Sequence, residues 1–389
     1  MKRIRPLRST RATPDQQALM RDARALGFSG SRLEDAFWEA RLTRQIDALL
    51  KSGDEDALNS ALEQLYQGND RGYESLIDLM ESRAESHSTE KGGNLLLIAL
   101  PVLAWSRFSI PSGPIRKEVM TNLRVQLQAH VLAADVKLGL ADILFSPEQL
   151  PFGFCETARF TGRLGHTALH NDDLHLDPGQ LPEAMNFLSD IRYVLGVVAF
   201  AEGAPAFRWQ EDGGNRDQVL RQWQQQGGEA LRPLFPGCAL ETELPTAFFN
   251  ACRDADRAAR PYALRASVAF LNTVLNAAPN ELTATMAPFE DDGRLVEYRI
   301  GFTQANKPQV VHGVVWPLLD GEDENTDVPA QVEALLKEAG GVQFRYLDND
   351  FPAEYCEDCG VPYYPNPDGE AVHAELPEEQ NNAIPRHLH

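Results

Sequence analysis

The segment from Asn94 to Phe108 constrains the fold more than any other part of this chain, because apolar residues follow one another there with little interruption. Such a segment has no polar face to leave in water, so other elements must cover it on all sides. Its longest apolar run, from Leu95 to Trp105, contains Pro101 and is well short of the roughly 20 residues that a membrane-spanning helix needs. We therefore expect it to lie at the centre of a globular core, with no membrane span.

Helix-start signals dominate the chain before this segment. Residues 13–16 read Thr-Pro-Asp-Gln, a capping box with proline at the first helical position, and residues 31–34 repeat the signal as Ser-Arg-Leu-Glu. Two further helices are predicted after Asp54 and Asp70, where apolar residues recur at helical spacing. These elements predict a bundle of paired helices, and the polar, glycine-containing residues 86–93 are interpreted as the linker that follows it.

Helical and strand-like patterns alternate after the linker. In chain order we expect a helix at 115–134, strands at 137–145, 193–200 and 206–210, a helix at 216–226, a strand at 239–244, a helix at 262–276, strands at 281–287, 296–303 and 309–316, a helix at 329–339 and a strand at 342–347. The order of elements repeats, and at one constant offset Trp209 aligns with Trp316 and Cys252 with Cys359. The sequence thus predicts an α+β, or mixed α/β, fold: an N-terminal helical module followed by a duplicated α/β unit with mixed or antiparallel sheets.

The predicted division of the chain follows from these patterns and from charge. It comprises a basic disordered arm (1–12), the helical module (13–90), a first α/β unit (91–250), a second α/β unit (251–360) and an acidic C-terminal tail (361–389). The net charge of −21 opposes non-specific binding to nucleic acid and to anionic membranes. Because the basic residues gather near the start of the chain and the acidic ones near its end, the two ends could attract each other or a neighbouring copy. The expected partners are therefore another protein or a second copy of the chain.

The cysteines indicate a reducing compartment. They are five in number, an odd count for a disulfide framework, and the basic start of the chain is not followed by the apolar stretch of a signal peptide. We therefore expect a cytoplasmic protein.

Cys356 and Cys359 form a C-x-x-C-Gly motif that is typical of half a zinc site, because both sulfurs of such a turn can reach one metal ion. His373 is the nearest further donor, and His387 or His389 could supply a fourth ligand. Thiols without a metal remain an alternative. A redox dithiol is disfavoured, because the acidic residues between the two cysteines raise thiol pKa values. The sequence predicts structural zinc held by Cys356, Cys359 and His373.

A second group of polar residues follows Gly165. It contains potential ligands for zinc, manganese or iron at His166, His170, Asp172, Asp173 and His175. The two first histidines would share a helix face, but the glutamate of a zincin H-E-x-x-H motif is missing, so a polar loop competes with a catalytic metal site.

Arg253, Arg257 and Arg260 recur at helical spacing and form a candidate anion site, since each guanidinium offers a planar fork of donors. The competing interpretation is local pairing with Asp254 and Asp256 at the surface. No phosphate-binding loop and no G-x-S-x-G nucleophile motif is present in the sequence.

Several separated motifs carry a family resemblance. They are Leu-Ala-Trp-Ser-Arg-Phe at 103–108, Ile-Pro-Ser-Gly at 110–113, Pro-Gly-Cys at 236–238, Ala-Cys-Arg-Asp-Ala-Asp-Arg at 251–257, Glu-Tyr-Arg-Ile-Gly-Phe at 297–302 and Tyr-Cys-Glu-Asp-Cys-Gly at 355–360. In these the chain resembles the beta-proteobacterial domain-of-unknown-function family 2863. The resemblance implies a bacterial cytosolic protein and assigns no reaction, ligand or catalytic residue.

Two functional hypotheses follow. The first is a non-enzymatic interaction or regulatory module with a C-terminal structural zinc knuckle. The alternative is a metal-dependent hydrolase that uses His166, His170 and His175 with Asp172 or Asp173.

Overall fold

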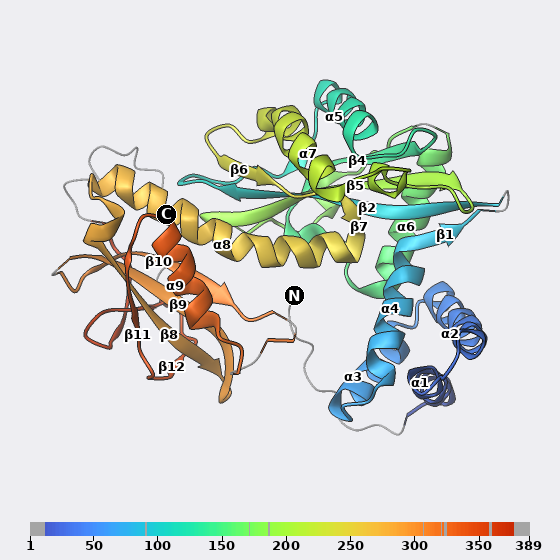
Figure 1. The fold of residues 1–389 in the computed structure, drawn as a ribbon, viewed down its shortest axis with the longest axis horizontal. Coiled ribbons are helices and arrows are strands. Elements are labelled where there is room, and N and C mark those ends of the chain that lie inside the picture. Colours follow the sequence, from blue (N-terminus) through green and yellow to red (C-terminus); the bar gives the residue numbers. More distant parts are fainter. Residues whose placement is uncertain are drawn as a thin grey trace.

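The computed structural model describes residues 12–89, 92–170, 172–185, 187–305, 307–319, 321–322, 325–357 and 360–376. Three groups of elements follow one another along the chain: a helical module, a first sheet with helices on both faces, and a second, smaller sheet (Figure 1). The mixed α+β class predicted from the sequence is confirmed. None of the helices in the described part of the chain has the length and apolar character that a membrane crossing requires.

The helical module contains α1 (Pro14–Gly27), α2 (Arg32–Ser52), α3 (Glu55–Gln67) and α4 (Gly72–Glu85). Both predicted helix starts are correct: the Thr13 hydroxyl accepts the Gln16 N–H in a full capping box, and the Ser31 hydroxyl accepts the Glu34 N–H. Apolar residues from these helices enclose a core that also includes Cys155 of the first sheet's helical layer. The module therefore shares its core with the main body.

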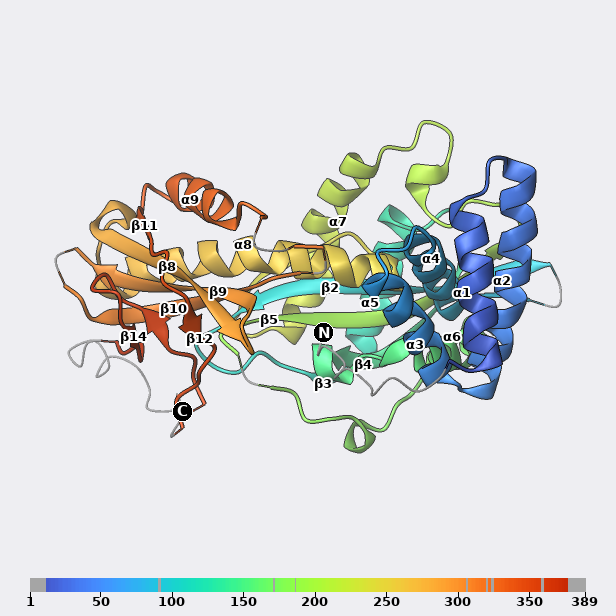
Figure 2. The ribbon, with the colours of Figure 1, turned by 90° about the horizontal axis from the view of Figure 1, so that it is seen from below.

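The first sheet runs in the order β1-β2-β5-β4-β3, with β6 and β7 also paired to β2. Its strands are β1 (Ser86–Ser88), β2 (Gly93–Trp105), β3 (Gly113–Pro114), β4 (Lys137–Phe145), β5 (Ser189–Ala201), β6 (Ala239–Thr242) and β7 (Thr246–Ala247). All of its pairings are antiparallel. The helices of its two layers are α5 (Lys117–His130), α6 (Gly153–Leu169), α7 (Arg216–Leu231) and α8 (Phe248–Leu275), and α8 runs alongside β2 (Figure 2).

Strand β2 is the buried element that the sequence predicts. Its side chains alternate between two cores: Leu100 and Val102 lie in the core shared with α5 and α7, while Leu97 and Leu103 lie in the core shared with α8. One edge of β2 pairs with β5 along its whole length, and the other pairs in turn with β1, β7 and β6. Along this second edge, Pro101, which has no N–H to donate, lies between the residues of β2 that pair with β7 and those that pair with β6. The strand is thus covered on both faces and both edges.

Two local predictions around this sheet are wrong. Residues 86–93 are not simply a linker, because β1 pairs antiparallel with the start of β2 and extends the sheet. Residues 206–210 do not form a strand; Arg208–Gln210 is a short 3-10 helix, whose start is closed by the Gln210 side chain accepting the Ala206 and Phe207 N–H groups.

The second sheet has the order β10-β9-β8-β11, with β12 also paired to β8. Its strands are β8 (Leu282–Asp291), β9 (Arg294–Gln304), β10 (Val310–Pro317), β11 (Gln343–Tyr346) and β12 (Phe351–Pro352). Helix α9 (Val328–Glu338) and the second half of α8 share an apolar core with this sheet. Helix α8 also packs on β2, so it joins the two sheets, and the predicted boundary between residues 250 and 251 lies inside it.

The topology gives the predicted internal duplication no support. In the first sheet, β4 and β5 are neighbours that are joined through α6, whereas β8, β9 and β10 follow one another as a meander of hairpins. Strands β11 and β12 pair parallel to β8, whereas the pairings between the named strands of the first sheet are all antiparallel. A similar order of helices and strands along the chain therefore led to different sheets.

The last described residues pack on one face of the second sheet, and α8 and α9 pack on the other face. They form a small ribbon of β13 (Tyr364–Pro365) and β14 (Ala371–Val372). Two glycines make room for it: a side chain at Gly301 would collide with the Pro365 carbonyl, and one at Gly313 would collide with the Tyr364 ring. Close backbone approach thus explains the glycine of the 297–302 motif.

Candidate binding cleft

The predicted histidine and aspartate cluster is divided among separate contacts. His166 lies in the last turn of α6 and His170 directly follows that helix, with their ring centres 4.7 Å apart. The His170 ring also contacts the carbonyl of His166 through Nδ1, at 2.8 Å. The carboxylate of Asp172 caps the neighbouring Asp173 N–H.

Asp173 and His175 bind to the sheet instead of to a common centre. The Asp173 carboxylate accepts the Leu140 N–H of β4 at 3.0 Å and pairs with Arg124 of α5. His175 Nδ1 lies 2.7 Å from the Asp142 carboxylate, and this hydrogen bond, together with the negative charge of Asp142, raises the pKa of the histidine. These side chains fix the loop after α6 against β4.

The arginine stripe lies on α8, and each guanidinium contacts a different element. Arg253 pairs with Glu81 of α4 at 2.5 Å, and Arg257 pairs with Asp254 of its own helix at 3.3 Å. The three guanidinium groups therefore point to different partners, and only Arg257 makes the local pair, with Asp254, that the competing interpretation predicts.

Arg260, the third member, is buried between α8 and the second sheet. It binds the Glu322 carboxylate through two N–H groups, at 2.6 and 2.9 Å, and donates to the Pro317 carbonyl. Its guanidinium also lies 4.9 Å from the ring centre of Trp316. These contacts give Arg260 a structural role.

Cys356 lies in a tight turn. Its N–H donates to the Val361 carbonyl and its carbonyl accepts the Gly360 N–H, both at 2.8 Å, and Gly360 has a φ of 70°. Cys359 lies outside the described residues, and His373 directly follows β14. Among the described residues, no three His, Cys, Asp or Glu side chains are grouped so that they could hold a metal ion. The predicted zinc site therefore stays a prediction.

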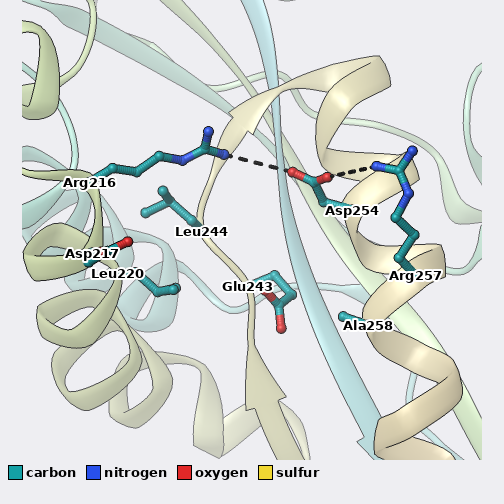
Figure 3. A pocket seen from close by; sticks show the side chains of 8 residues that line it. All are labelled: Arg216, Asp217, Leu220, Glu243, Leu244, Asp254, Arg257 and Ala258. Carbon is teal, nitrogen blue, oxygen red and sulfur yellow. Dashed lines mark hydrogen bonds and ion pairs between the residues drawn. The ribbon is translucent and has the colours of Figure 1, made fainter. Parts of the chain in front are cut away.

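A surface cleft of about 390 Å³ opens between α7, α8 and the connection from β6 to β7 (Figure 3). Its lining residues are Arg216, Asp217, Leu220, Glu243, Leu244, Asp254, Arg257 and Ala258. They come from three separate stretches of the chain, and sequence patterns indicated only Arg257 as a candidate site residue and Asp254 as its expected pairing partner.

The Asp254 carboxylate holds the two arginines of the cleft in place. Its oxygens lie 3.7 Å from Arg216 and 3.3 Å from Arg257, which approach it from opposite sides in Figure 3. The Asn250 amide donates a third contact at 3.0 Å, and Arg216 also lies over the Trp209 ring. Both guanidiniums thus have a carboxylate partner.

Glu243 differs from Asp254, because no described residue donates a hydrogen bond to its carboxylate. Burial raises its pKa, and the negative charges of Glu241 and Asp254 raise it further, against a smaller opposing effect of Arg265. Its main chain is fixed on both sides: the N–H donates to the Pro101 carbonyl at 3.1 Å, and the carbonyl accepts the indole N–H of the buried Trp223 at 2.9 Å. The cleft therefore contains a partly buried carboxyl group whose main chain is held on both sides.

Glu85, a second carboxyl group that sequence patterns missed, joins the helical module to the body. It ends α4, and its carboxylate accepts the N–H of Phe249 in the first turn of α8 at 3.0 Å. Burial raises its pKa to about 7, with a further contribution from the charge of Glu81, although the Phe249 N–H and Arg253 act in the opposite direction. A partly protonated carboxyl group therefore caps α8 near neutral pH.

The family model described as protein of unknown function (DUF2863) matches residues 4–387, and the chain therefore belongs to that family. No curated protein and no solved structure matches it.

Proposed function

We propose that this member of the DUF2863 family is a non-enzymatic interaction or regulatory protein whose partner binds in the cleft between α7 and α8. The cleft itself carries this proposal, because it presents charged groups of both signs beside apolar side chains on a rigid frame. Binding sites combine such features: a concave, partly apolar surface with a few fixed polar groups that orient the ligand.

Photo-crosslinking from the cleft tests this function. A photoreactive phenylalanine derivative replaces Leu220 in the cleft of the full chain, or Val125, which is exposed on α5, as the matched control. In a lysate of the source organism, the Leu220 probe is expected to give a discrete crosslinked protein that the Val125 probe does not. Introducing Ala258→Trp, which fills the cleft without changing its charge, into the Leu220 probe should remove the product. A product that survives this change, or no product at all, contradicts the proposal.

We further propose that zinc stabilises the C-terminal segment through Cys356, Cys359 and His373. The tight turn at Cys356, with Gly360 in the left-handed region, has the backbone form that suits a thiolate metal knuckle. His373 is carried by the β13–β14 ribbon, which packs on the same sheet as this turn.

Metal analysis of the purified protein tests the zinc proposal. Wild type is expected to contain about one zinc per chain, and Cys356→Ser should lose it and unfold at lower temperature, because metal binding and folding are coupled. Cys238→Ser, which removes another partly buried thiol, is the matched control and should retain the metal. A metal-free wild type contradicts the proposal, and metal lost in His170→Ala would favour the metal-dependent hydrolase instead.

A further inference from the structure

We infer that the cleft between α7 and α8 recognises a cationic side chain, arginine or lysine, in a peptide segment of the partner. This inference rests on the proposed function and specifies the chemistry of the ligand. Three observations support it: the balance of charge in the cleft, the partly buried Glu243 carboxyl group on a fixed main chain, and the apolar side chains beside it.

The cleft is lined by more acidic than basic side chains. Its lining holds three carboxyl groups, Asp217, Glu243 and Asp254, against the guanidiniums of Arg216 and Arg257. The single carboxylate of Asp254, which pairs with both arginines, balances one of their two positive charges, and the carboxyl groups of Asp217 and Glu243 together outweigh the other. The carboxyl groups of Glu243 and Asp217 have no basic partner among the described residues within ion-pair distance. A cation is therefore the complementary ligand.

The carboxyl group of Glu243 is the group in the cleft that best suits a cationic ligand. Hydrogen bonds to Pro101 and Trp223 fix its main chain, so only the side chain of Glu243 has to be oriented when a ligand arrives. A charged donor would supply the hydrogen bonds that its poorly solvated oxygens lack, and charge-assisted hydrogen bonds of this kind are about twice as strong as neutral ones. The free protein thus pays a desolvation cost that a guanidinium or ammonium group would offset.

Apolar side chains stand beside this carboxyl group. Leu220 on α7, Leu244 next to Glu243 and Ala258 on α8 line the same cleft. Arginine and lysine bury an aliphatic stem along apolar surface while the charged end reaches a polar group. A small metal cation would make no use of this wall, so the shape favours an amino-acid side chain.

Binding of short synthetic peptides to the full chain tests the inference. The probes are acetylated, amidated pentapeptides with a central arginine, lysine, citrulline or glutamate, and calorimetry measures their dissociation constants. The arginine and lysine peptides are expected to bind at least ~10-fold more tightly than the citrulline peptide, a neutral isostere of arginine. Glu243→Gln should remove this preference, whereas Glu229→Gln, on the exposed part of α7, should preserve it.

The outcomes separate this inference from the proposed function. Equal binding of all four peptides, tighter binding of the glutamate peptide, or a preference that survives Glu243→Gln would overturn the inference. If a cleft-dependent crosslinked partner is still found in any of these cases, the proposed function stands without it. Cleavage of the arginine peptide during incubation, detected by mass spectrometry, would overturn the non-enzymatic function but leave the cationic specificity intact.

The chain's own basic arm is a second source of the same chemistry. It carries Lys2, Arg3, Arg5, Arg8 and Arg11. Replacing all five by glutamine in the full chain distinguishes the sources. Unchanged affinity for the arginine peptide identifies a partner's segment as the ligand, as we infer. A rise of more than ~3-fold shows that the arm competes for the cleft, which supports cationic specificity but overturns the partner as its source.

Discussion

Replacing Arg299 by methionine is expected to lower the free energy of unfolding by about 3–5 kcal/mol, the usual cost of breaking a buried ion pair. Arg299 is fully buried in β9, where it binds Glu297 at 2.7 Å and donates to the carbonyls of Glu354 and Tyr363. Those two carbonyls flank the Cys356 turn. Loss of Arg299 therefore leaves the Glu297 carboxylate without its ion-pair partner. It also removes the two hydrogen bonds that hold this turn on the sheet.

Urea unfolding and amide hydrogen exchange measure this effect. Exchange should accelerate most in β13 and β14, which lie on the same face of the sheet. The double variant Glu297→Gln with Arg299→Met should recover part of the lost stability, because it leaves no unpaired buried charge. A single variant within about 1 kcal/mol of wild type would contradict this role of Arg299.

Replacing Glu85 by glutamine is expected to make the protein more stable than wild type at pH 8, by about 2–3 kcal/mol. The pKa of Glu85 is raised from 4.5 to about 7 in the folded protein. The stabilising contribution of its protonated form is therefore complete below pH 4.5 and is lost as the pH rises through 7. Glutamine is neutral throughout, and its amide oxygen can still accept the Phe249 N–H.

The difference in unfolding free energy between Glu85→Gln and wild type, measured from pH 5 to pH 8, is the decisive quantity. It should grow with pH, while Glu63→Gln, on the exposed surface of α3, should show no such trend. A difference that does not change with pH, or a variant that is less stable at pH 8, would mean that Glu85 is an ordinary ionised cap of α8.

Local patterns were sufficient to predict most of the elements and the burial of the segment that forms the central strand. Capping residues determine the starts of α1 and α2, because the hydrogen bonds that they make are local. The continuous apolar character of β2 reflects burial on both faces, which composition alone reveals. The strand pairing could not be predicted in this way. Whether consecutive strands form hairpins, as in β8 to β10, or pair across a helix depends on long-range packing.

The cleft was missed for a similar reason. Arg216, Glu243 and Asp254 are far apart in sequence, and each is an ordinary surface residue type. Helical spacing correctly grouped Arg253, Arg257 and Arg260 on one helix, but it could not reveal that they contact α4, α8 itself and the second sheet. The one available signal for Glu243 was a charged residue near the end of the predicted strand at 239–244, two positions before Pro245. Its importance depends on Pro101 and Trp223, which only the fold brings near.

The pKa of the Glu243 carboxyl group, measured by NMR with and without the arginine peptide, tests the recognition site most directly. In the free protein we expect a pKa above the ordinary glutamate value, because the group is poorly solvated and lies near Glu241 and Asp254. Saturation with the peptide should lower that pKa, since a bound guanidinium stabilises the ionised carboxylate. An ordinary pKa in the free protein, or one that the peptide leaves unchanged, would contradict the cleft as a site for cationic side chains.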